Sequence, residues 1–191
     1  MTRTTPQPVL RNGIDTTALR ATIAAVRAEP ELAKVTFSVG SDWLNGCHQR
    51  AHTGEVRQDG TTISSRTATY EFESDEPVAL LGTDRAASPG EYILQALAGC
   101  YAVTFAANAA ARDIELSALR LELEIDFDLR GFLAIDDDVR PGAQHIRVTV
   151  HAKSPNASET QLRELTDEVQ RRSPIRDTLA NPVVVTTSLA A

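Results

Sequence analysis

One segment of twenty residues constrains the fold of this chain more than any other. Tyr92 to Ala111 is apolar or small throughout except at Gln95 and Asn108, and much of it is alanine rather than leucine. Its length is close to the roughly 20 residues that cross a bilayer. The two polar interruptions and the alanine content instead favour a central helix inside a soluble protein.

The residues just before this segment have the composition of a helix start. Ser88 can cap the helix, Pro89 suits the first turn, and Glu91 lies near the positive end of the helix dipole. The sequence therefore predicts one long helix from Ser88 to about Arg112, with Cys100 inside it.

Alternating and helical patterns on both sides of this helix predict the other elements. Turns are expected at Asn45-Gly46 and at Asp59-Gly60, the second of which is a strong hairpin signal. The order of strands, long helix, strands, helix and strand indicates an α+β fold with antiparallel sheets. Helices are predicted at 16–27, from Asn156 or Ser158 to 170, and at 175–179, and strands at 35–39, 51–57, 61–72, 119–127, 146–150 and 182–187.

Composition excludes some partners. The formal net charge of −7 gives no basic field for nucleic acid or anionic lipid, so neither is expected as a partner. Residues 1–12 are polar and contain proline, which predicts a flexible leader rather than an export signal. The expected compartment is the cytoplasm, where a lasting disulfide between Cys47 and Cys100 is disfavoured.

No metal or other cofactor is expected. The chain has two cysteines and four histidines, and only Cys47, His48 and His52 cluster. This set is short of the four ligands of a structural zinc site, and His145 and His151 offer no comparable ligand spacing.

Taken from the residues alone, Cys100 has two interpretations. A free cysteine in an apolar helix is commonly a small buried hydrophobe, and an apolar setting suppresses the reactive thiolate. It can also be a nucleophile if the sulfur is ionisable and reachable. Glu91 precedes it by nine residues, or 2.5 helical turns, so the two side chains do not share a helix face.

The segment S-P-G-E-Y-I-L-Q-A-L-A-G-C-Y (residues 88–101) resembles the cysteine helix of the OsmC/Ohr family. This family comprises the osmotically inducible and organic-hydroperoxide-resistance proteins. The likeness runs from about Phe37 to the C-terminus, so that residues 35–191 form the expected OsmC-like domain and residues 1–34, the leader and an amphipathic helix, lie outside it. Further matching segments are 74–77, 81–84, 109–116, 126–131, 140–142, 146–150, 172–179 and 181–183.

The resemblance implies a two-layer α+β fold, assembled as an intertwined homodimer with the reactive thiol near the dimer interface. It also implies a peroxidase in which Cys100 attacks the O–O bond of a hydroperoxide and becomes a sulfenic acid. A glutamate and an arginine would hold the thiolate. Glu91 is the candidate glutamate, and Arg50, ahead of Arg66, is the candidate arginine.

The sequence departs from the family's well-characterised peroxidases at the resolving thiol and at the glutamate. Ser173 stands where those enzymes have a cysteine before the late proline. Gly90 stands where their glutamate follows the proline of the helix start, and Glu91 comes one residue later. Cys47 is a candidate second thiol; without it, an external small thiol would reduce Cys100.

The leading hypothesis is therefore an OsmC-like thiol-dependent peroxidase that reduces organic or hydrogen peroxide in oxidative stress defence. The alternative is a non-catalytic dimer that binds a small ligand in the same interface pocket, with Cys100 as lining. A third hypothesis is a redox-responsive interaction partner whose assembly changes on oxidation.

Overall fold

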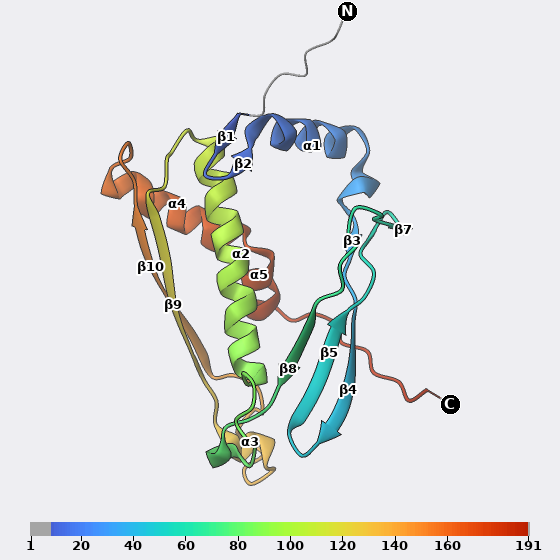
Figure 1. Cartoon of the computed structure of the whole chain (residues 1–191). Helices are drawn as coiled ribbons and strands as arrows, with labels where there is room; N and C mark the ends of the chain where they lie inside the picture. The colour runs from blue at the N-terminus through green and yellow to red at the C-terminus, as the bar shows by residue number, and fades with distance from the viewer. Residues whose placement is uncertain (1–8, 191) are drawn as a thin grey trace, which may run out of the picture. The chain divides into compact units, whose positions relative to one another are not determined.

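The computed structural model describes residues 9–190, and the chain divides into two compact units. Unit 1 is residues 15–93 together with Val9, and unit 2 is residues 10–14 together with the chain from Leu94 onward. The long helix α2 (Pro89–Ala111) contains the boundary between them. Figure 1 gives the element labels used below.

Unit 1 is built on a three-stranded antiparallel sheet in the order β4-β5-β8. The strands are β4 (Val39–Asn45), β5 (His48–Thr53) and β8 (Glu71–Ser74), and β5 lies between the other two (Figure 1). A second small sheet has the order β3-β6-β7 and consists of β3 (Val35–Thr36), β6 (Arg57–Gln58) and β7 (Thr61–Thr62).

Both predicted turns of unit 1 are confirmed. Gly46, between β4 and β5, has a φ of 58°. Asp59 and Gly60 have φ values of 48° and 70° and join β6 to β7 as a two-residue loop. Positive φ at both central residues is the type I′ geometry that suits the twist of a hairpin.

Helix α1 (Thr16–Ala28) begins at Asp15, whose carboxylate accepts the N–H groups of Thr17 and Ala18. A short 3-10 turn, η1 (Pro30–Ala33), follows it. A second such turn, η2 (Val78–Leu80), lies in the connection after β8. The helix was predicted from its stripe of apolar residues at helical spacing, but no residue of α1 is buried.

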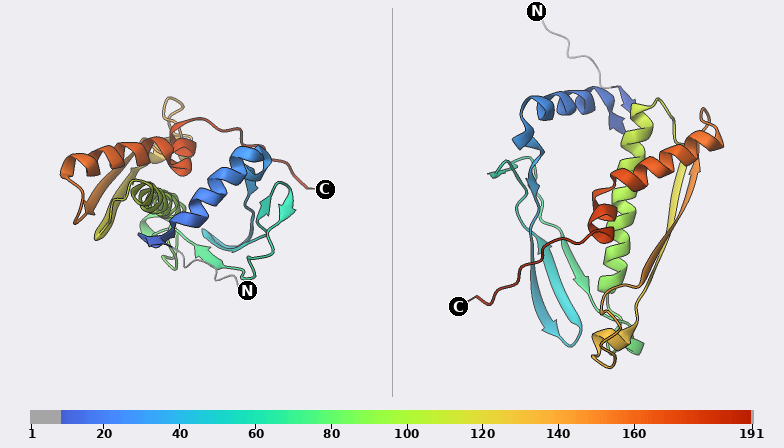
Figure 2. Two further views of the ribbon diagram at one scale, coloured as in Figure 1. Left: turned by 90° about the horizontal axis from the view of Figure 1, so that it is seen from above. Right: turned by 180° about the vertical axis from the view of Figure 1, so that it is seen from behind.

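Unit 2 combines α2 with an antiparallel ribbon and further helices (Figure 2). Its elements are β1 (Leu10–Arg11), which pairs with β2 (Ile14–Asp15), then β9 (Ala118–Asp126), α3 (Leu129–Phe132), β10 (His145–Lys153), α4 (Glu159–Arg172) and α5 (Pro174–Ala180). The register of the ribbon pairs Leu123 with Val148 and alternates buried and exposed positions along both strands. The predicted half-buried strands are thus confirmed, with a charged outer face.

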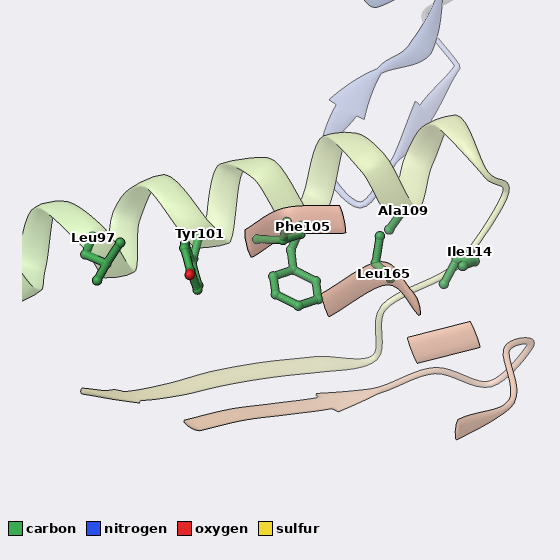
Figure 3. Close-up of a cluster of buried hydrophobic side chains, with 7 residues drawn as sticks. Leu97, Tyr101, Phe105, Ala109, Ile114 and Leu165 are labelled. Atoms are coloured by element: carbon green, nitrogen blue, oxygen red, sulfur yellow. The ribbon is translucent and has the colours of Figure 1, made fainter. Parts of the chain in front are cut away.

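The core of unit 2 lies between α2, α4 and the inner face of the ribbon (Figure 3). Residues at four-residue intervals on α2 form one stripe of this core, since positions i and i+4 lie on the same helix face. The buried residues are Leu97, Tyr101, Phe105, Ala109, Ile114, Leu165 and Val169.

Several sequence predictions need correction or fall on residues outside the described part of the chain. The predicted strand 61–72 is wrong in its middle, because only β7 and β8 form at its ends, and the predicted strand 51–57 is interrupted between β5 and β6. The predicted strand 182–187 is wrong as well, because this segment pairs with no strand among the described residues. Residues 1–8 of the predicted leader lie outside the described residues, while Leu10 and Arg11 are paired in β1.

Candidate active site

The start of α2 is fixed by a reciprocal pair of hydrogen bonds. The backbone N–H of Glu91 donates to Ser88 Oγ at 3.2 Å, and the N–H of Ser88 donates to the Glu91 carboxylate at 2.8 Å. This is the geometry of a capping box. Ser88 is confirmed as the cap, and the carboxylate of Glu91 contributes to the helix start.

Cys100 lies half-buried near the middle of α2, next to the buried stripe. Residues 96, 100, 104 and 108 form a neighbouring stripe at the same four-residue spacing. Thr104 Oγ1 donates to the Cys100 carbonyl at 2.7 Å, and Asn108 Nδ2 donates to the Thr104 carbonyl at 2.9 Å. The side chains of Thr104 and Asn108 therefore donate hydrogen bonds to backbone carbonyls of α2, and the Cys100 sulfur is the reactive group of this stripe.

Ser173 lies directly against the sulfur. Its Oγ is 3.2 Å from Cys100 Sγ, a contact between residues 73 positions apart in the sequence. The Ser173 side chain is fully buried, at 0% exposure. The structure thus brings together Cys100 and Ser173, the residue at the position where the family resemblance implies a second thiol.

An open groove of about 950 Å³ runs along this part of unit 2. This volume is in the range of small-molecule sites, roughly 300–1,000 Å³. Its walls come from α2 on one side and from the end of α4 and the start of α5 on the other. Residues that line it include Ala96, Gly99, Cys100, Val103, Thr104 and Asn108 on α2, and Glu168, Arg172, Pro174 and Ile175 opposite.

Charge on the groove comes from Glu168 and the arginines around it. The Glu168 carboxylate accepts hydrogen bonds from Arg171 at 2.6 Å and from Arg172 at 2.9 Å, and Arg112 lies 3.9 Å away. The bond from Arg171, followed by that from Arg172, lowers the pKa of Glu168 to about 2. Of these four charged residues, Glu168 and Arg172 line the groove itself.

Arg172 and Glu168 are not among the site residues predicted from the sequence. The predicted arginines, Arg50 and Arg66, come from an earlier part of the chain, whereas Arg172 lines the same groove as Cys100. The available signal was the segment Arg172-Ser173-Pro174, which was already part of the family resemblance.

Arg50, the first-choice arginine, lies on β5 in unit 1, where the strand register sets it opposite Glu73. Its Nε and Nη2 atoms each lie 2.8 Å from Glu73 Oε1, and His48 Nε2 lies 3.0 Å from Glu73 Oε2. Hydrogen bonds from His48 and then Arg50 lower the pKa of Glu73. The Tyr92 hydroxyl, in the first turns of α2, donates to the Glu73 carbonyl at 2.6 Å.

Arg66, the second choice, lies over the ring of Tyr70, with its guanidinium carbon 5.2 Å from the ring centre. It is thus engaged in a cation–π contact within unit 1. The catalytic roles of Arg50, Arg66 and Glu91 stay predictions.

Cys47 is exposed at the end of the β4–β5 turn, with its sulfur 3.7 Å from the Leu81 carbonyl oxygen. Both cysteines are free thiols. No group of three or more His, Cys, Asp or Glu side chains suited to a metal occurs among residues 9–190.

Helix α2 is long and apolar enough to cross a membrane by length and composition alone, a property that core helices of soluble proteins share.

Solved structures support this architecture at the level of the fold. An OsmC-like protein from Mycoplasma pneumoniae is similar with a TM-score of 0.58 and 22% identity, over 76% of this chain and 87% of that one. An OsmC-like protein of unknown function from Vibrio cholerae has a TM-score of 0.55 at 10% identity, covering 75% and 92%. An organic hydroperoxide resistance protein OsmC from Legionella pneumophila has a TM-score of 0.52 at 13% identity, covering 75% and 88%.

No curated protein matches the chain. The family model for OsmC-like proteins matches residues 82–188, which is more than half of the sequence and includes α2, the ribbon, α4 and α5. The chain has the α+β architecture of its structural neighbours. This protein therefore belongs to the OsmC-like protein family.

Proposed function

We propose that this protein is a thiol-dependent peroxidase that reduces organic or hydrogen peroxides through Cys100, in defence against oxidative stress. The observation that carries the proposal is the setting of the sulfur. Cys100 lines an open groove and is in contact with a buried hydroxyl group. A sealed aliphatic setting, the alternative expected of a packing cysteine, would offer neither feature.

The first half-reaction is a nucleophilic displacement on oxygen. The Cys100 thiolate attacks the terminal oxygen of the hydroperoxide, an S–O bond forms, and the O–O bond breaks. The leaving alkoxide takes a proton and departs as an alcohol, or as water from hydrogen peroxide. The sulfur is oxidised to a sulfenic acid and the peroxide is reduced by two electrons.

The second half-reaction uses an external small thiol. Its sulfur attacks the Cys100 sulfenic acid, the S–O bond breaks and water leaves, so that a mixed disulfide forms. A second thiol molecule attacks this disulfide, which restores Cys100 and releases the oxidised reductant. Ser173 has no sulfur with which to form the disulfide directly, which supports this route.

The proposal is tested by peroxide consumption. Purified protein with excess dithiothreitol should consume cumene hydroperoxide catalytically, and Cys100→Ser should reduce the rate to that of dithiothreitol alone. A wild-type rate no higher than the thiol background would reject the function. Cys47→Ser, treated with one equivalent of peroxide without dithiothreitol, tests the second thiol. If Cys47 resolves Cys100, the wild type forms a disulfide between positions 47 and 100 and the variant keeps a sulfenic acid on Cys100; if an external thiol does, both proteins keep the sulfenic acid.

A second candidate function is binding of a small ligand without catalysis. The size and largely apolar lining of the groove favour it, as does the serine at position 173. In that case the protein would not consume cumene hydroperoxide. A ligand bound in the groove would slow alkylation of Cys100.

We further propose that the protein functions as a homodimer in the cytoplasm, where its two free thiols stay reduced. Large exposed apolar side chains support a partner copy, because monomers rarely leave so many uncovered. They include Phe37, Val39 and Trp43 in and next to β4, and Val184, Val185 and Leu189 near the C-terminus. Native mass spectrometry of the reduced and the oxidised protein tests both the dimer and a redox-responsive assembly.

A further inference from the structure

We propose that Ser173 is a positioning residue that orients the Cys100 sulfur and donates its hydroxyl hydrogen bond to it, a bond that the thiolate accepts better than the thiol. The catalytic meaning of this role rests on the proposed peroxidase function, although the hydrogen bond itself does not. The starting observation is the 3.2 Å contact between Ser173 Oγ and Cys100 Sγ.

The direction of this hydrogen bond follows from the other partners of Ser173. The backbone N–H of Arg176 donates to Ser173 Oγ at 3.3 Å, so one lone pair of the oxygen is already engaged. The hydroxyl has a single proton, and the sulfur is the acceptor within reach. The arrangement therefore points that proton toward Cys100.

Ionisation of the thiol strengthens this contact. A neutral thiol can either donate to Ser173 or accept from it, whereas a thiolate has no proton and can only accept. A hydrogen bond to an ionised acceptor is roughly twice as strong as one between neutral groups. Since Ser173 binds the charged form better than the neutral form, it favours the thiolate.

The position of Ser173 makes this bond hard to replace with water. The residue is fully buried, and its backbone N–H donates to the Val169 carbonyl at 2.9 Å where α4 ends. It is also the N-cap of α5, because its Oγ accepts the N–H of Arg176. Two helix ends thus fix the hydroxyl, while the groove, whose lining includes Cys100 and Pro174, gives a peroxide access to the sulfur.

The same position determines how oxidised Cys100 is resolved. A cysteine at position 173 could attack the sulfenic acid and expel water to form a disulfide. A serine hydroxyl cannot do so, and it remains a hydrogen-bond partner of the oxidised sulfur. Ser173 therefore supports the first half-reaction and leaves the second to a thiol that enters from the groove.

The test is the pH profile of Cys100 alkylation by iodoacetamide, followed by peptide mass mapping so that Cys47 is scored separately. Ser173→Ala and Ser173→Gly both remove the hydroxyl, but glycine retains more of the capping preference. Both variants should shift the midpoint of the Cys100 profile upward by about one to two pH units, the range expected for one hydrogen bond to a charged group. Ser173→Thr, which keeps the hydroxyl, should retain the wild-type midpoint.

Ser158→Ala is the matched control, because it removes another helix-capping hydroxyl that has no contact with sulfur. Its Cys100 profile should be that of the wild type. An unchanged midpoint in both folded hydroxyl-free variants would overturn the proposal. If neither variant folds, Ser173→Cys provides the second measurement: peroxide should convert it to a disulfide between positions 100 and 173, and failure to form this bond would contradict the contact.

The outcomes for this inference and for the proposed function are separable. Alkylation needs no peroxide, so a shifted profile in a protein that consumes no hydroperoxide would reject the peroxidase and keep the role of Ser173. Conversely, peroxide turnover together with the same pH profile of Cys100 alkylation in all variants would keep the peroxidase function and reject the role of Ser173.

Discussion

At the scale of single residues, Asp75 in unit 1 is a carboxylate whose lone pairs are almost fully used. One oxygen accepts the N–H of Glu76 at 2.8 Å, and the other accepts the Thr83 hydroxyl at 2.6 Å and the N–H groups of Thr83 and Arg85. The side chain is 1% exposed. Asp75 thus holds the connection between β8 and α2 in place.

These hydrogen bonds, that of Thr83 first, lower the pKa of Asp75 from 3.8 to about 2. A carboxylate with a lowered folded-state pKa stabilises the fold above its unfolded value and loses that contribution as the pH falls through the folded value. We therefore expect part of the stability to be lost between about pH 4 and pH 2. Thermal unfolding should show that Asp75→Asn is destabilised at pH 7 and that its difference from the wild type narrows through this window.

Asp84 is the matched control for Asp75. It lies in the same connection, and its carboxylate makes no hydrogen bond within the described part of the chain. It has a φ of 55°, a conformation that asparagine tolerates well. Asp84→Asn should leave the acid dependence unchanged, and equal acid profiles for both variants would contradict the role given to Asp75.

At this scale the sequence predicted Cys100 as the candidate reactive group, but not its surroundings. The contact with Ser173 depends on how the end of α4 packs on α2, which no local pattern encodes. The pairing of Arg50 with Glu73 depends on the register between β5 and β8. Arg172 belongs to a charged helix end, and such residues are commonly solvated.

At the scale of secondary-structure elements, α4 begins with a complete capping box. Ser158 Oγ accepts the N–H of Gln161 at 3.3 Å, and Gln161 Oε1 accepts the N–H of Ser158 at 2.9 Å. Of the two caps that the sequence left open, Ser158 is the one observed. Asn156 instead donates to the Asp113 carbonyl and accepts the N–H of Glu115.

Loss of this cap should have a measurable cost. Ser158→Ala should lower the free energy of unfolding by about 1 kcal/mol, which is a fall of about 2–4 °C in the melting temperature of a chain of this size. Thr160→Ala, two residues further and exposed, is the control and should be neutral or slightly stabilising. Equal melting temperatures for Ser158→Ala and the wild type would contradict the structural role of the cap.

The predictable elements were those with local signals strong enough to act alone. Helix α2 has a cap, an N-terminal proline and a long apolar run, and β9 alternates over nine residues. The segments 63–70 and 182–187 have β-branched residues but form no strand. Strand formation requires a partner to pair with, and propensity alone does not supply one.

At the scale of the whole molecule, the exposed apolar side chains predict self-association. Trp43 is 73% exposed and Phe37 72% exposed, and Val184 is 95% exposed. Light scattering in size-exclusion chromatography should give twice the chain mass of 20.7 kDa. The triple change Phe37→Ser, Val39→Ser, Trp43→Ser should shift the protein toward monomer, and a monomeric wild type at micromolar concentration would contradict the dimer.

The account as a whole depends on Cys100 being a thiol that hydroperoxides oxidise. The most direct measurement is to treat the reduced protein with one equivalent of cumene hydroperoxide in the presence of dimedone, which traps sulfenic acids, and to map the adduct by peptide mass spectrometry. We predict that the adduct forms on Cys100 and is absent from the Cys100→Ser variant. An unmodified Cys100 with the peroxide left unconsumed would contradict the account.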